Sequence, residues 1–330
     1  MSISSLSGTA QAQTPYSQMP KRRSLSVTTT CALTDVPSDA RQIDLWIPVF
    51  SENDRQTVRL VTTDLQGGRI TRDPKFGNRM LYRRITDPAK ELTNGTLTIV
   101  LSYEVEIREQ VVAAAKTLPS TVKVAPDRAL DPYLGDWNLI PIAGPITELA
   151  ARIDLPKGEP LRAGRRIYDY LIDTMPYNYR APGAGRGDAV WACDSKTGDC
   201  SDYHSVFIGV SRSLGIPADH VFGVPFSPDK PSGETAYYHC WARFWVGGIG
   251  WVPVDASEAD KHPTERDYLF GSLSTRCLEL SHGRDIVLEP RQAGEPLNTF
   301  VKPLAEVDGK PFAGVRWSCA YGERTDAGSP

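Results

Sequence analysis

The chain has 330 residues, of which 40% are apolar and 23% are charged, and its formal net charge at pH 7 is -3. This length allows two ordinary domains, or one domain with large additions, and either can bury a hydrophobic core. Neither a basic field nor a long apolar run is present, so we expect no nucleic-acid partner and no membrane insertion.

Residues 1–24 are rich in Ser, Thr, Gln and Pro and show no hydrophobic period, which predicts a disordered tail. They lack the apolar stretch of a signal peptide, so the chain as written is expected to stay in the cytoplasm. The segment "TAQAQTP" resembles the end of a secretory signal, and loss of an upstream stretch would instead make the protein periplasmic or secreted. The sequence gives no indication of the oligomeric state.

Short alternating and β-branched runs, such as "RQIDLWIPVF" and "GTLTIVLSYEVEI", fill residues 25–115 between clusters of Asp, Asn, Gly and Pro. They predict an antiparallel β-sandwich. Residues 116–144 contain several prolines and no sustained period, which predicts a linker on the surface.

Two segments with helical spacing, 146–153 and 161–175, come next, followed by an irregular glycine-containing stretch over 180–197. A third helix is expected from about Ser201 until Gly215 and Pro217 stop it. The strand-like runs "HVFGVPF", "YYHCWARFWV" and "GWVPVDAS" complete a predicted core over residues 145–275. Residues 276–330, which include "RDIVLEP", "VRWSCAY" and a hairpin at Asp308 and Gly309, are predicted to form a β extension packed on this core. The fold class is α+β.

Six cysteines are scattered along the chain without a CxxC pair, which indicates neither a zinc ribbon nor a disulfide framework. Cys200 stands at the N-terminal edge of the third helix, where unpaired N–H groups and the helix dipole favour a negative charge. It is therefore a candidate nucleophile. The alternative is a small buried residue, which is how most free cysteines behave, and position alone does not separate the two.

A nucleophilic cysteine needs a base, and the base needs a group that fixes its ring. His239 lies on an alternating strand whose other face, including Cys240, is apolar and is expected to pack in the core. Asp255 lies on the next strand, beyond "GGIG". A three-residue connection would pair Val246 with Gly250 and put His239 and Asp255 on one face, whereas a four-residue connection would turn Asp255 away.

With these residues in view, the sequence resembles the transglutaminase-like superfamily, a branch of the papain-like thiol enzymes. The resemblance rests on "GDCSDYHSVFIGVSRSLGIPA" and "HCWARFWVGGIGWVPVDAS" and covers about residues 146–260. It implies a central helix packed on an antiparallel sheet, with Cys200 as nucleophile, His239 as base and acid, and Asp255 as orienter. The N-terminal sandwich resembles the β domain that precedes this core in many bacterial relatives.

The resemblance implies a thiol-dependent acyl-transfer enzyme that needs no cofactor and acts on a protein or peptide. Hydrolysis of a peptide or side-chain amide through a Cys200 thioester is the first expectation, because water is always present. Transfer of the acyl group to an amine, as by a transglutaminase, is the alternative. A third possibility is an inactive module that only binds peptides.

Two further residues are candidates for the site. Trp191 offers an indole N–H to an oxyanion, and His204, four residues after Cys200, is a second base, a site-lining donor or a structural residue. A metal site made of Cys200, His204, His239 and Asp255 would lack the usual short ligand spacings, so we expect no metal.

Overall fold

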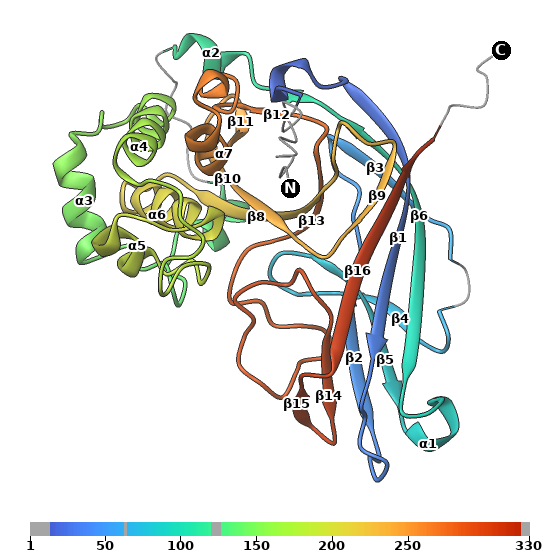
Figure 1. Cartoon of the computed structure of the whole chain (residues 1–330). Coiled ribbons are helices and arrows are strands. Elements are labelled where there is room, and N and C mark those ends of the chain that lie inside the picture. The colour runs from blue at the N-terminus through green and yellow to red at the C-terminus, as the bar shows by residue number, and fades with distance from the viewer. Residues whose placement is uncertain (1–13, 63–64, 120–126, 325–330) are drawn as a thin grey trace, which may run out of the picture.

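The protein has one lobe rich in helices and one lobe of long strands (Figure 1). The computed structural model describes residues 14–62, 65–119 and 127–324. Within these ranges no helix is long and apolar enough to span a membrane. The helices are α1 (Pro88–Glu91), α2 (Ala114–Thr117), α3 (Pro145–Ile153), α4 (Pro160–Thr174), α5 (Ala189–Ser195), α6 (Cys200–Ser213) and α7 (Ala256–Lys261).

Two antiparallel five-stranded sheets form the strand-rich lobe, with the orders β3-β6-β1-β16-β9 and β15-β14-β2-β5-β4. Every second residue of β1 and β6 is buried, because alternate side chains of a strand point to opposite faces. The inward side chains, among them Leu25, Leu45 and Leu101, share one hydrophobic core. The strands are β1 (Arg22–Leu33), β2 (Ile43–Pro48), β3 (Gln56–Leu60), β4 (Arg69–Arg72), β5 (Arg79–Ile85), β6 (Leu97–Arg108), β9 (Ser232–Thr235), β14 (Leu304–Val307), β15 (Lys310–Phe312) and β16 (Val315–Glu323).

Both ends of the described chain build this sandwich, which corrects the predicted domain boundaries. Residues 276–330 were expected to pack on the core, but β16 pairs with β1 and β14 pairs with β2. Figure 1 shows β16 running beside β1 over its whole length. The inward residues Trp317, Cys319 and Tyr321 fill the same hydrophobic core as β1 and β6, which explains why this strand lies there. The hairpin at Asp308 and Gly309 is confirmed, with both residues at positive φ.

A smaller antiparallel sheet, ordered β11-β10-β8-β13, carries the helices and confirms the α+β class. Its strands are β8 (Ala218–Pro225), β10 (His239–Val246), β11 (Gly250–Val254) and β13 (Cys277–His282), and the short β7 (Gln110–Val111) and β12 (Ser272–Leu273) pair nearby. The core sheet therefore extends past the predicted end at residue 275. "RDIVLEP" is not a strand, and only Ile286 makes an isolated bridge there.

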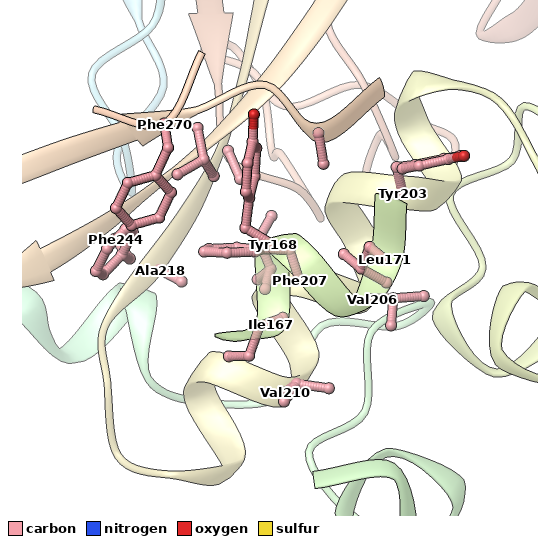
Figure 2. Close-up of a cluster of buried hydrophobic side chains, with 14 of the residues drawn as sticks. Ile167, Tyr168, Leu171, Tyr203, Val206, Phe207, Val210, Ala218, Phe244 and Phe270 are labelled. Atoms are coloured by element: carbon pink, nitrogen blue, oxygen red, sulfur yellow. The ribbon is translucent and has the colours of Figure 1, made fainter. Parts of the chain in front are cut away.

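The central helix α6 is buried along its whole length between α4 and the sheet. Figure 2 shows side chains of α4 and α6 meeting around Tyr168 and Phe207, with Phe244 of β10 and Phe270 completing the cluster. A Cβ on Gly164 of α4 would lie 2.5 Å from the Phe244 ring, so glycine permits this close approach. Such tight packing fixes both the helix that carries Cys200 and the strand that carries His239.

The N-terminal segment is more ordered than predicted. Residues 14–24 were assigned to a disordered tail, but Tyr16 is only 5% exposed and accepts a hydrogen bond of 2.6 Å from Arg276. The backbone N–H of Ser17 also donates to Glu265 at 2.9 Å. The polar composition of this segment predicts disorder, but the core accommodates its aromatic side chain, Tyr16. Residues 1–13 of the predicted tail lie outside the described residues.

The end of the predicted linker also belongs to the helical lobe. Trp137 and Ile140 are buried in the same hydrophobic cluster as α6, and they pair with each other across a tight turn. They are three positions apart, and a single such pair does not establish a period, which is why the pattern appeared irregular. Residues 120–126 of this linker lie outside the described residues.

Candidate active site

Helix α6 begins at Cys200 because the residues before it form a reciprocal cap. The side chain of Asp199 accepts from the N–H of Ser201 at 2.8 Å, and the side chain of Asp202 accepts from the N–H of Asp199 at 3.0 Å. This is a capping box, which satisfies donors that the first helical turn leaves free. Cys200 therefore occupies the first position of the helix, one residue earlier than predicted.

The same Asp202 carboxylate also holds the glycine-containing loop that precedes α5. Its oxygens accept from the N–H groups of Gly185 at 2.8 Å and Gly187 at 2.9 Å. Burial raises the pKa of Asp202, while these backbone hydrogen bonds oppose the shift. Asp199 and Asp202 were not among the predicted site residues, although the D-x-x-D spacing around Cys200 is a recognisable capping pattern.

The β10–β11 connection has the register on which the site depends. Val246 pairs with Gly250, so the connection contains three residues, as the first of the two alternatives requires. His239 and Asp255 then lie diagonally on one face, and His239 Nε2 is 2.6 Å from Asp255 Oδ2. The predicted meeting of these two side chains is confirmed.

Asp255 is fixed by more than His239. It is the N-cap of α7, and its Oδ1 accepts from the Ser257 hydroxyl at 3.1 Å and the Glu258 N–H at 3.0 Å. Burial would raise the pKa of this carboxyl, but His239 and these hydrogen bonds lower it well below its ordinary value. Asp255 is therefore a carboxylate held in one orientation.

Cys200 and His239 shift each other's pKa in opposite directions, which favours opposite charges on the two side chains. Cys240 lowers the pKa of Cys200, burial opposes this effect, and His239 adds to the lowering, leaving the pKa at about 5. For His239, burial would lower the pKa, but Asp255 and Cys200 raise it well above the ordinary value. At neutral pH the pair is a thiolate and an imidazolium, with Asp255 on the far side of the ring.

Of the other two predicted residues, His204 borders this centre, with its Nε2 3.7 Å from Asp255 Oδ1, and Trp191 does not. His204 is fully buried, and its Nε2 accepts from the backbone N–H of Ala256 at 3.1 Å, which anchors the residue next to Asp255. That contact matches the structural role among the three possibilities for His204. Trp191 lies on α5, where a Cβ on Gly183 would come within 2.9 Å of its indole nitrogen. Among the described contacts, none joins Trp191 to Cys200.

A different group of side chains has the spacing of a metal site. One ligand atom each from His204, His220 and Cys240 lies within 4.8 Å of the others. However, the Ala256 N–H donates to Nε2 of His204, and Arg284 donates to Nδ1 of His220 at 3.1 Å. In a neutral imidazole the second nitrogen then carries the proton, so both nitrogens that face Cys240 are N–H donors. The trio is poorly suited to a cation.

A thiol at the start of a buried helix, beside a histidine and an aspartate of an antiparallel sheet, defines a cysteine–histidine–aspartate protein of the α+β class. Residues 147–256 match the model of the transglutaminase-like superfamily. This match includes Cys200, His239 and Asp255 and supports the resemblance seen in the sequence.

Three known proteins are similar to this chain. An uncharacterized protein from Haemophilus influenzae is 26% identical over an alignment of 308 residues, and the match covers 82% of each chain. The fold is similar to that of a candidate cysteine protease from Cytophaga hutchinsonii, with a TM-score of 0.58, 15% identity and 94% of each chain covered. The periplasmic domain of TgpA from Pseudomonas aeruginosa gives a TM-score of 0.38 at 15% identity, covering 78% of this chain and 90% of that one.

Proposed function

We propose that the protein is a thiol-dependent acyl-transfer enzyme that hydrolyses a peptide or side-chain amide through a thioester on Cys200. The observation that carries this proposal is the position of His239, whose Nε2 is 2.6 Å from Asp255 and whose charge lowers the pKa of Cys200. A thiolate beside an imidazolium is both a ready nucleophile and a ready proton donor. A protein or peptide is the substrate class that we assign.

The reaction follows from the same geometry. Cys200 Sγ attacks the amide carbonyl carbon, and the carbonyl oxygen becomes an oxyanion. The N–H of Cys200 has no acceptor within the helix at its first position, so it can donate to that oxyanion. His239 gives its proton to the departing amine, and the C–N bond breaks. His239 then takes a proton from water, which attacks the thioester, and the C–S bond breaks to release the acid and restore the Cys200 thiolate beside the His239 imidazolium.

An activated acyl ester tests the proposal without knowledge of the natural substrate. We expect p-nitrophenyl acetate to acylate Cys200, and the adduct to appear by peptide mass mapping in the parent protein but not in Cys200→Ala. Adding a labelled primary amine separates the two outcomes, since a hydrolase loses the acyl group to water and a transglutaminase passes it to the amine. Equal nitrophenol release by the parent and by Cys200→Ala, without an adduct, would contradict the proposal.

The charge state of the pair predicts the pH dependence. Because the pKa of Cys200 is lowered to about 5, the thiolate forms as the pH rises through that value. Because the pKa of His239 is raised, the imidazolium persists to well above its ordinary range. We expect the rate of iodoacetamide alkylation at Cys200 to rise near pH 5 and to stay level through neutrality. A rise that begins only above neutral pH would show an ordinary thiol.

A further inference from the structure

A second thiol lies beside the nucleophile, and the acyl-transfer steps above do not use it. Cys240 is fully buried and belongs to the same small cluster as Cys200, Phe222 and Val301. The two cysteines affect each other's titration, since Cys240 lowers the pKa of Cys200 and Cys200 raises that of Cys240. It was expected to be part of an apolar strand face. Its neighbours are polar as well as apolar, and they determine where its proton points.

A backbone N–H group determines which atoms donate and which accept in the hydrogen bonds around Cys240. The Ala256 N–H can only donate, and it donates to Nε2 of His204 at 3.1 Å. Burial lowers the pKa of His204, so its ring is neutral and the remaining proton is on Nδ1. That nitrogen is 4.0 Å from Cys240 Sγ. His204 is therefore the donor and the Cys240 sulfur is the acceptor.

Since Cys240 accepts from His204, its own proton is free to point to another acceptor. Two candidate acceptors are nearby: the hydroxyl of Ser201, which is 3.7 Å from the Cys240 sulfur, and Cys200, which packs in the same buried cluster as Cys240. The Ser201 hydroxyl also meets the Tyr238 hydroxyl at 3.3 Å. A thiolate is the better acceptor, because hydrogen bonds to ionised groups are about twice as strong as those between neutral groups.

We propose that Cys240 is a positioning residue that donates a second hydrogen bond to the thiolate of Cys200, with His204 fixing its direction. The chain of donors runs from the Ala256 backbone through His204 and Cys240 to the nucleophile, beside the bond from His239. This proposal rests on the proposed function, because it assigns a role in holding the same nucleophile.

Other charged and titratable groups face the two thiols from every neighbouring element. Asp199 and Asp202 lie at the start of α6, and Tyr177 lies in the segment before α5. Tyr238 and His239 lie on the β10 side, His220 on β8, and Arg284 after β13. Substitution of Cys240 alone leaves all of these in place, so a change in the titration of Cys200 reports the missing thiol.

The test is the pH profile of iodoacetamide alkylation at Cys200, followed by peptide mass mapping. In Cys240→Ala we expect the midpoint to rise by roughly one pH unit, because removing a hydrogen bond to a charged group shifts its protonation about tenfold or more. Cys240→Ser keeps a donor and should stay near the parent midpoint. Cys319→Ala removes an equally buried thiol from β16 and should leave the midpoint unchanged.

Each outcome is decisive. A raised midpoint in Cys240→Ala together with rescue by Cys240→Ser supports the proposal, since simple loss of packing would lower the melting temperature of both variants without moving the midpoint. An unchanged midpoint in Cys240→Ala overturns it, and the proposed function stands if the parent still reacts at low pH. A parent Cys200 that reacts as an ordinary thiol overturns both.

Discussion

Replacing His239 with Ala is expected to slow the alkylation of Cys200 at about pH 6 by roughly 100-fold, because the thiol then loses its cationic partner and titrates at a higher pH. The pKa of Cys200, now about 5 against an ordinary 9.0, should rise by roughly three units, since Cys240 alone is left to oppose the effect of burial. At a pH above this new value the two proteins should react at similar rates. Turnover of an acyl ester should fall as well, because the acid and base are gone.

His262→Ala is the matched control for this prediction. His262 lies just after α7 in the same lobe, its side chain is 35% exposed, and it does not contact Cys200. Its removal should leave the alkylation profile unchanged. The remaining cysteines, most of them buried, report on folding, because a partly unfolded His239→Ala would gain labels at several of them. A folded His239→Ala that still reacts with a midpoint near pH 5 would remove His239 from the site.

The arrangement of the centre was largely predictable because it depends on local rules. The helix start before Ser201 and the alternation around His239 are visible in the residues, and one loop length decided whether Asp255 would face His239. Cys240 was assigned to the core on the same alternation, and its side chain is indeed buried. Its closeness to Cys200 comes from the packing of α6 on β10, a tertiary contact that no periodicity reports.

The domain boundaries were less predictable, because strand pairing between distant parts of the chain leaves no local pattern. The sequence of β16 alternates as expected for a strand, but nothing in it indicates that the strand pairs with β1. Tyr16 likewise stands alone in a polar segment, and its burial depends on Arg276 and Glu258 far along the chain. Local composition predicts whether a segment forms a helix or a strand. The positions of β16 and Tyr16 in the fold depend instead on which hydrophobic surfaces the rest of the chain leaves exposed.

Replacing Asp202 with Ala is expected to lower the free energy of unfolding by about 3–5 kcal/mol, since a helix cap and two buried loop hydrogen bonds are lost together. The alanine would leave the N–H groups of Asp199, Gly185 and Gly187 without their acceptor. Urea denaturation measures the loss, and faster hydrogen exchange at Gly185 and Gly187 would show that the loop has been released. Asp194→Ala, on the exposed side of α5, should change stability by less than about 0.5 kcal/mol.

The Asp202 variants also distinguish the effect of the helix cap on stability from its effect on the reactivity of Cys200. Asp202→Asn keeps one acceptor oxygen but turns an amide donor toward a backbone donor, so we expect a loss between those of the parent and Asp202→Ala. Both variants keep His239 and Cys240, which lower the pKa of Cys200. If the cap acts mainly on stability, the alkylation midpoint of Cys200 should move by less than it does in His239→Ala. A larger shift in Asp202→Ala would mean that the helix terminus, rather than the imidazolium, is the main stabiliser of the thiolate, because the first turn would no longer present its N–H groups to the sulfur.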